Sequence, residues 1–307
     1  MHANILIDSK QNEQHRYYYR NSWLQLIRPM TLTGTISPIL VGTGLAFLNG
    51  HFQMNLLFAL FISALLIQSA TNVLNDYYDF KYGQDKEKWT KQDDAISHGP
   101  AHETLPYIAS GMLIVATLFG LYLAYSSTMW VIIVGILGIL AGFRYSAGKS
   151  SFSSIGMGEF VAAIFLGPVV TMLAYLVQAQ TINSTVIMVS LLFSMLIASM
   201  ILTNNIRDLK KDIGFRKTLA YRLGRKKAVR LLMTILVLPY LSIIALVAFQ
   251  LLHLPSLMSL LALPFAIRLI WSFRKSASRQ EEIGGMKWAA RHHWAFGMLF
   301  AISLWLF

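Results

Sequence analysis

Acidic residues stand at the end of a long apolar run, in the stretch NVLNDYYDFKYGQD that covers residues 72–85. Asn72 and Asp76 are four residues apart and Asp79 follows three later, so a helix would carry all three on one face. The carboxyl end of a helix has a partial negative charge, which disfavours a carboxylate there by a few tenths to about 1 kcal/mol. A cation bound among these side chains would explain why acids occupy this place.

A second stretch, LTNNIRDLKKDIGFRKTLAYRLG at 202–224, repeats the pattern. Asn204 and Asp208 are again four residues apart, Asp212 follows four later, and Arg207 lies beside them. The shared frame of Asn-x-x-x-Asp followed by a further acid suggests two halves built alike. Solvated loop acids that pair with nearby Lys and Arg are the alternative for either stretch alone, and the match between the two argues against it.

Oxygen ligands are the only metal ligands that these stretches offer, because the chain has no Cys and its eight His are scattered. Adjacent His292 and His293 would point about 100° apart on a helix, so we expect interfacial side chains there rather than a metal pair. Carboxylates select a hard cation, and Mg²⁺ is usually held by one or two of them together with substrate phosphates. We therefore expect Mg²⁺ around a diphosphate, with the metal ligands Asn72, Asp76, Asp79, Asp208 and Asp212.

Basic residues should contact the same anion. Tyr145 and Lys149, four apart in YSAGKS, are one helical turn from each other, and Arg28 opens an apolar run in LIRPMTL. Lys and Arg at inner helix ends are also expected for topology alone, so each has this second interpretation. Glu159 in GMGEF is interpreted as a simple acid at a helix N-terminus. The candidate substrate contacts are Arg28, Asn72, Asn75, Lys149, Asn204, Arg207 and Lys217, with Arg216 beside the last, and Tyr145 joins Lys149 and the four aspartates as a catalytic candidate.

Membrane-spanning helices must position these residues. Of 307 residues, 55% are apolar and 13% charged, about half the charged fraction of a soluble domain, and the mean hydropathy is +0.53. Apolar runs long enough to cross a bilayer recur along the whole chain, which excludes a single-span or peripheral protein. The sequence predicts an all-α polytopic membrane protein, in one domain over 1–307, with nine spans near 30–48, 54–78, 105–125, 129–145, 157–178, 184–205, 229–251, 254–273 and 288–307.

The charged residues predict the orientation of these spans. All 26 Lys and Arg and all 14 Asp and Glu fall on alternate connections, whereas NGHFQ, YSST, QAQTINS and QLLHLP carry no charge. By the positive-inside rule, the N-terminus with its polar segment 1–27 is cytoplasmic and the C-terminus lies outside. Residues 1–20 lack the apolar core of a cleavable signal peptide. The net charge of +12 is therefore mostly topological, and we expect no nucleic-acid partner.

With NDYYDFKYGQD and NNIRDLKKDIGFRKTLAYRLG, the chain resembles the UbiA superfamily of intramembrane prenyltransferases. Within it, the chain looks most like the menaquinone branch, the 1,4-dihydroxy-2-naphthoate polyprenyltransferases. The resemblance runs from WLQLIRPMTLTGTISPILVGTGLA to the last span, and RPMTL, YSAGK and GMGEF support it. It implies a ring of nine helices in the cell membrane, with Mg²⁺ and diphosphate at a cytoplasmic mouth.

The resemblance also assigns residues. It places the first acidic motif of the family on Asn72, Asp76 and Asp79, the second on Asp208 and Asp212, the Tyr-x-x-x-Lys pair on Tyr145 and Lys149, and the first-helix arginine on Arg28. Much of the superfamily has a third aspartate where this chain has Gly83, with Asp85 two residues later. ISHGP has Ser97 and His98 where the branch tends to have Arg. The roles of Asp85 and His98 therefore stay open.

The activity implied is Mg²⁺-dependent transfer of a polyprenyl group from polyprenyl diphosphate to 1,4-dihydroxy-2-naphthoate, with loss of CO₂. Another acceptor, such as 4-hydroxybenzoate or haem, is the alternative within enzymes. A secondary transporter is the alternative outside them, but it should carry an ionisable residue at the centre of a span, and none is found. Prenyl length and oligomeric state are not fixed by the sequence.

Overall fold

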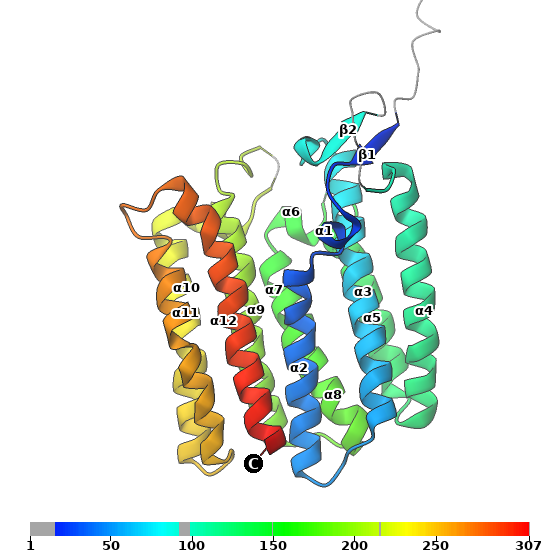
Figure 1. Ribbon diagram of the computed structural model, residues 1–307, viewed down its shortest axis with the longest axis vertical. Coiled ribbons are helices and arrows are strands. Elements are labelled where there is room, and N and C mark those ends of the chain that lie inside the picture. Colours follow the sequence, from blue (N-terminus) through cyan, green and yellow to red (C-terminus); the bar gives the residue numbers. More distant parts are fainter. Residues whose placement is uncertain (1–15, 92–98, 149, 215, 307) are drawn as a thin grey trace, which may run out of the picture.

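Long helices that stand side by side make up most of the protein in this computed structural model, which describes residues 16–91, 99–148, 150–214 and 216–306 (Figure 1). Two short antiparallel strands, β1 (Tyr17–Tyr19) and β2 (Trp89–Lys91), pair beyond one end of the helices. The helices are α1 (Trp23–Ile27), α2 (Pro29–Leu48), α3 (Met54–Lys81), α4 (Leu105–Ser126), α5 (Trp130–Ser146), α6 (Phe152–Ile155), α7 (Gly158–Ile164), α8 (Val170–Ala179), α9 (Ser184–Arg207), α10 (Leu219–Ala248), α11 (Leu263–Trp271) and α12 (Arg279–Leu306).

Seven helical segments among the described residues are long and apolar enough to cross a membrane. A π-helical turn at Phe165–Val169 joins α7 and α8 into one of them, and a 3₁₀ segment at Leu254–Ala262 extends α11 into another. Helix α5 is apolar but only 17 residues long, and the first half of α12 is charged, so neither is among the seven. The structure therefore supports an all-helical membrane protein, while the count of nine spans stays a prediction.

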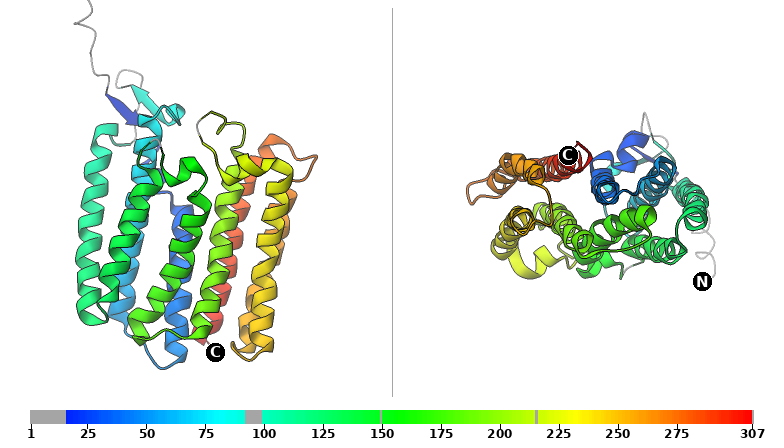
Figure 2. Two further views of the ribbon diagram at one scale, coloured as in Figure 1. Left: turned by 180° about the vertical axis from the view of Figure 1, so that it is seen from behind. Right: turned by 90° about the horizontal axis from the view of Figure 1, so that it is seen from below.

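The helices are arranged in two rows, as the view from below in Figure 2 shows. In one row α11, α12, α2 and α3 follow one another, and in the other α10, α9, α8 and α5, with α4 beside α3 and α5 at one end. Contacts between the rows join α2 to α8 and α9 to α12. The close approach of α2 to α8 requires Gly42, because a Cβ there would lie 2.3 Å from the carbonyl oxygen of Thr171.

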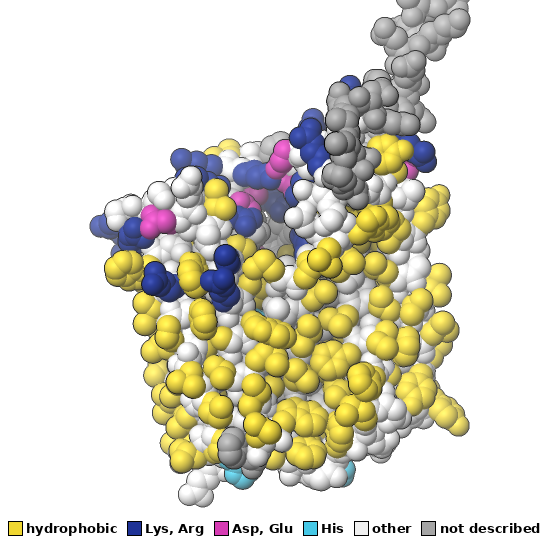
Figure 3. Space-filling model, viewed as in Figure 1, with side chains coloured by type: hydrophobic (Ala, Val, Ile, Leu, Met, Phe, Trp, Pro, Cys, Tyr) yellow, Lys and Arg dark blue, Asp and Glu magenta, His cyan; other side chains and the backbone are white. Residues whose placement is uncertain are grey.

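Charged side chains gather at one end of the molecule (Figure 3). Hydrophobic side chains cover the flanks of this face, while Lys, Arg, Asp and Glu surround a hollow at the end that carries β1 and β2. The loops after α3, α5 and α9 also lie at this end (Figure 1). An apolar flank with one charged rim suits a protein surrounded by lipid.

The paired histidines of α12 differ from the interfacial placement expected for them, since both are fully buried between helices. Nε2 of His292 lies 2.8 Å from the Tyr240 hydroxyl of α10, and Nε2 of His293 lies 3.0 Å from the Ser37 hydroxyl of α2. The two rings thus bond in different directions and join α12 to two neighbours.

Candidate active site

A cavity of about 900 Å³ opens at the charged end of the molecule. Its wall is formed by α2, α3, α4, α5, α7, α8 and α9, and Leu60 and Asp79 of α3 both line it. These residues are 19 positions apart on one helix, so the cavity extends roughly 28 Å along α3. The part far from the mouth is apolar, with Leu60, Leu123, Val131, Leu173 and Ile132 among its lining residues. The space suits a long hydrocarbon chain with a polar head at the mouth.

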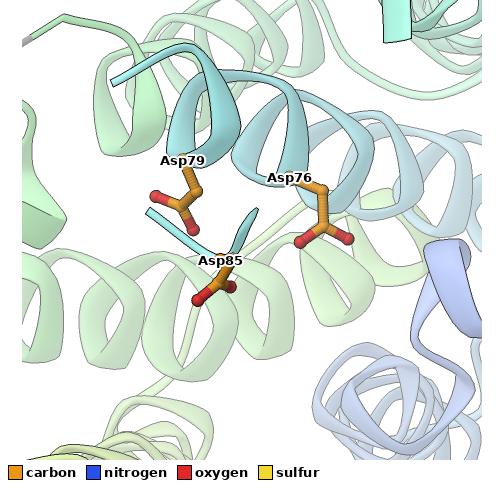
Figure 4. Close-up of side chains that lie close together, drawn as sticks. All are labelled: Asp76, Asp79 and Asp85. Carbon is orange, nitrogen blue, oxygen red and sulfur yellow. The ribbon is translucent and has the colours of Figure 1, made fainter. Parts of the chain in front are cut away.

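Three carboxylates lie together near the mouth: Asp76 and Asp79 of α3, and Asp85 of the loop that follows (Figure 4). Asp79 and Asp85 line the cavity, whereas Asp76 is not among its lining residues. One oxygen of each lies within 4.8 Å of the others, and Asp76 and Asp79 are buried. Helix α3 continues to Lys81, which puts Asp76 and Asp79 on one face as the spacing predicted. The tertiary fold adds Asp85, whose part the sequence left open.

The turn between α3 and Asp85 has glycine, Gly83, at the position where much of the superfamily has a third aspartate. Gly83 has a φ of 85°, a conformation that glycine adopts freely and that strains a residue with a Cβ. The backbone N–H of Gln84 donates to the carbonyl of Asp79 at 2.7 Å and closes this turn. Asp85 itself has a φ of 49°, which Asp tolerates better than most residues. The third acid is therefore placed after the turn rather than within it.

Four basic side chains neutralise this cluster. Arg28 and Lys88 both donate to Oδ1 of Asp76, at 2.6 Å and 2.7 Å. Lys88 also contacts Oδ2 of Asp85 at 2.6 Å. The loop after α9 supplies the other two: Arg216 donates to Asp79 at 2.5 Å, and Lys211 bridges Asp85 and Glu87. Segments from three parts of the chain thus meet on these acids.

Burial and neighbouring charges shift the pKa values of Asp85 and Arg28 in opposite directions. Burial disfavours the charged form of Asp85, but Lys88 and Lys211 outweigh it and hold the pKa of this carboxyl well below its usual range. Burial likewise disfavours a charged Arg28, yet the Asp76 carboxylate raises the pKa of the guanidinium above its usual range. Burial and then Asp76 raise the pKa of the Tyr19 hydroxyl to about 12. Asp85 and Arg28 are accordingly ionised, while Tyr19 stays neutral.

The second acidic stretch is built differently, although it lines the same cavity. Helix α9 ends at Arg207, so Asp208 caps the helix and Asp212 lies in the following turns. Arg207 donates to Asp208 at 2.6 Å and to the Asn204 side chain at 2.6 Å. Asp212 is buried and has no Lys or Arg ion-pair partner among the described residues. Burial raises the pKa of its carboxyl to about 6.

The remaining expected residues fall into two groups. Tyr145 of α5 lines the cavity and lies against Gly158, where a Cβ would be 3.4 Å from its ring. Asn72 and Asn75 also line the cavity, and the Asn72 amide donates to the Ile27 carbonyl at 2.8 Å, which fixes the turn at Arg28. Other residues are not brought in: Lys217 is exposed and absent from the lining, whereas its neighbour Arg216 belongs to it, and Lys149 and His98 lie outside the described residues.

Glu159 lies in the first turn of α7, as expected for an acid at a helix N-terminus, but its hydrogen bonds go to other helices; sequence reasoning passed over Lys88. Glu159 makes no cap to its own helix; its Oε1 accepts from the Asn205 amide at 2.6 Å and from the backbone N–H of Leu219 at 3.0 Å. It is buried and lines the cavity. The sequence did offer a signal for the contacts of Glu159, because the two glycines of GMGEF leave room beside this acid for another segment. Lys88 gave none, because it looks like any loop lysine.

The chain is similar to proteins of known family. A model of the UbiA prenyltransferase family matches residues 35–303. The 1,4-dihydroxy-2-naphthoate octaprenyltransferase of Bacillus subtilis (strain 168) is 33% identical over 282 residues, which is 91% of this chain and 91% of that one. UbiA prenyltransferase domain-containing protein 1 of Homo sapiens is 27% identical over 83% of this chain and 76% of its own.

Solved structures share the fold at low sequence identity. A UbiA homolog from Archaeoglobus fulgidus bound to DMAPP and Mg²⁺ superposes with a TM-score of 0.60 at 11% identity, covering 92% of this chain and 100% of that one. A digeranylgeranylglyceryl phosphate synthase also gives 0.60, at 14% identity, over 92% of this chain and 98% of that one.

Proposed function

The chain belongs to the UbiA prenyltransferase family, and from this premise we propose that it transfers a polyprenyl group from polyprenyl diphosphate to 1,4-dihydroxy-2-naphthoate with loss of CO₂. One observation supports the transfer most directly: two separate acidic stretches line the polar mouth of a single, otherwise apolar cavity. The naphthoate acceptor rests on the Bacillus subtilis relative, whose coverage of nearly the whole chain argues for a shared substrate.

The donor atoms at the mouth fit a hard divalent cation. Carboxylate oxygens of Asp76, Asp79 and Asp85 lie within 4.8 Å of one another, and among the described residues this group includes no His. We propose that these three residues, with Asp208 and Asp212 on the opposite wall, hold Mg²⁺. Bound there, Mg²⁺ would neutralise the charge of the departing diphosphate.

The protein's own side chains have three tasks in this proposal. Arg28 and Arg216 donate charge-assisted hydrogen bonds to diphosphate oxygens and so stabilise the leaving group. The C–O bond at the allylic carbon then breaks, and its electron pair stays with the diphosphate. The apolar walls exclude water from the allylic cation until the ring carbon that carries the carboxylate attacks it. The bond from that carbon to the carboxylate then breaks, CO₂ leaves, and the electron pair of the bond returns to the ring. Tyr145, whose hydroxyl has no hydrogen-bond partner among the described residues, is available to the diphosphate.

Membrane placement completes the proposal. We propose nine spans in a ring within one domain over 1–307, with a cytoplasmic N-terminus, an outer C-terminus and the cavity mouth facing the cytoplasm of a cell-membrane enzyme. The charged rim supports this orientation by the positive-inside rule. Since the chain has no Cys, single cysteines introduced into the loops can be labelled from either side of the membrane. Labelling of the loop after α3 from outside would reverse the proposed orientation.

A reconstitution experiment tests the activity. Purified protein is incubated with Mg²⁺, a long prenyl diphosphate and a panel of aromatic acids that includes 4-hydroxybenzoate, and the products are weighed by mass spectrometry. We expect prenylated naphthoquinol that lacks the mass of CO₂, and release of labelled CO₂ from carboxyl-labelled acceptor. A product that keeps the carboxyl group, or a preference for 4-hydroxybenzoate, would contradict the proposed acceptor chemistry.

A further inference from the structure

Lys88 stands where a cation is expected. Its ammonium nitrogen is 2.7 Å from Oδ1 of Asp76 and 2.6 Å from Oδ2 of Asp85, two of the three carboxylates that converge at the mouth. The side chain is 25% exposed, so the contact is largely withdrawn from water. A lysine between two proposed metal ligands competes with the metal for the same oxygens.

The backbone around Lys88 is fixed by the N-terminal segment. The carbonyl of Lys88 accepts from the backbone N–H of Arg20 at 2.9 Å, and the carbonyl of Trp89 accepts from Nε of Arg20 at 3.0 Å. Trp89 pairs with Tyr19 across β1 and β2, and their rings meet edge to face. The start of the Lys88 side chain is therefore held in place, while its four-carbon stem remains free to turn.

The charges of this cluster already balance without metal. Each acid has a basic partner, and the four acids and four bases joined by ion pairs are Asp76, Asp79, Asp85 and Glu87 with Arg28, Lys88, Lys211 and Arg216. Asp212 has no ion-pair partner among the described residues, but even when its carboxylate is counted, Mg²⁺ alone would leave a net positive charge in this partly buried group, which is unfavourable where water screens little. A diphosphate that enters with the metal restores the balance and offers oxygens to the displaced ammonium.

Resting on the proposed function, we propose that Lys88 is a built-in counter-cation that makes metal loading depend on the diphosphate. Without substrate, its ammonium bridges Asp76 and Asp85. When metal and diphosphate enter together, the ammonium leaves these carboxylates and donates to diphosphate oxygens. Lys88 is then a positioning residue for the metal and a contact of the leaving group in turn.

Metal binding without substrate tests this role. Mn²⁺, a hard ion that electron paramagnetic resonance detects directly, is titrated into metal-free protein in detergent. We expect Lys88→Met to bind Mn²⁺ about tenfold more tightly than the unchanged protein, equal to ~1.4 kcal/mol. Lys86→Met is the matched control, because it removes the same charge two residues away and Lys86 has no ion pair among the described residues; we expect a change below about twofold.

Linkage gives a second readout. Binding of farnesyl thiodiphosphate, an unreactive analogue, is measured with and without Mn²⁺. By linkage, Mn²⁺ must raise the affinity for the analogue by the same factor as the analogue raises the affinity for Mn²⁺. We expect this factor to be about tenfold smaller in Lys88→Met, because that variant already binds Mn²⁺ about tenfold more tightly without the analogue. Lys88→Gln serves as a second neutral variant, and elution as a single species in gel filtration shows that each variant is folded.

The outcomes separate this inference from the proposed function. If Asp76→Ala binds Mn²⁺ as the unchanged protein does, the proposed metal site itself is wrong. If Asp76→Ala loses Mn²⁺ but Lys88→Met and Lys88→Gln bind it with unchanged or lower affinity, the metal site stands and the role of Lys88 is overturned.

Discussion

The acidic stretches at the ends of α3 and α9 share the spacing Asn-x-x-x-Asp, yet their helices end at different points. Helix α3 continues to Lys81, so Asp76 and Asp79 are carried on helical backbone. Helix α9 ends at Arg207, which leaves Asp208 as its cap and Asp212 in a turn. The same spacing thus produces a pair on helical backbone, of which Asp79 lines the cavity, and a pair at and beyond a helix end, both members of which line it.

The ion pairs of the two stretches differ in the same way. Asp76 and Asp79 pair with Arg28, Lys88 and Arg216, all distant in sequence, and Asp76 is buried. Asp208 pairs with its neighbour Arg207, and its side chain is 21% exposed. The two acids of the first stretch therefore join distant segments, whereas the two acids of the second make no long-range ion pair among the described residues. Spacing predicts which residues share a helix face, but the tertiary fold decides which of them gain partners from distant segments.

Metal removal should have the largest effect, because it disables both stretches at once. Exhaustive chelation should abolish prenyl transfer, and Mg²⁺ or Mn²⁺ should restore it, since the candidate ligands are carboxylate oxygens. Product formation by mass spectrometry measures this. Full turnover in chelator would show that neither stretch acts through a metal.

Alanine at the central acid of each stretch should separate catalysis from stability. Asp76→Ala and Asp208→Ala should each lower turnover by roughly a thousandfold, through loss of a metal ligand. Only Asp76→Ala should also lower the thermal unfolding midpoint in detergent, because Arg28 and Lys88 lose a buried partner. The Arg207–Asp208 pair is partly buried, but it joins two adjacent residues at a helix end, so its loss should lower stability less. If the two variants lose the same stability, the ion pairs of Asp76 stabilise the protein no more than the ion pair of Asp208 does.

Arg216 and Lys217 are adjacent residues on the loop after α9, and they can be compared as a matched pair. Arg216 reaches Asp79 across the cavity, whereas Lys217 is exposed and away from the lining. Arg216→Ala should lower kcat/KM by about tenfold to a hundredfold, the range of a charge-assisted hydrogen bond. Lys217→Ala should change it by less than about twofold. A larger effect at Lys217 would indicate that Lys217 contacts the diphosphate, as the sequence favoured, and that Arg216 does not.

Tyr145 should show a smaller effect, because it lies outside both stretches and adds one hydroxyl. Tyr145→Phe keeps the ring that packs on Gly158 and should lower kcat by about tenfold, or 1.4 kcal/mol. Separate KM values for prenyl diphosphate and acceptor identify the substrate that the hydroxyl contacts. Unchanged kinetics for both would limit Tyr145 to packing.

Much of the site was predictable because helical spacing is local information. Asn72, Asp76 and Asp79 could be placed on one face from their separations, and the family from the stretches around them. Lys88 and Arg216 could not be assigned in this way, since loop lysines and arginines are common and their partners lie on other segments. Glu159 was interpreted by its position in its own helix, yet its hydrogen bonds go to α9 and α10.

A helical membrane protein with acids grouped at the ends of two apolar helices could be predicted from the amino-acid sequence, because hydropathy, charge and helical period are properties of contiguous residues. The packed fold was needed to show that Asp85 joins Asp76 and Asp79, and that Lys88 bridges Asp76 and Asp85. Those contacts depend on the φ of 85° at Gly83 and on the pairing of β1 with β2, which bring distant backbone together. Contacts of this kind form only when the whole chain packs, so no local pattern encodes them.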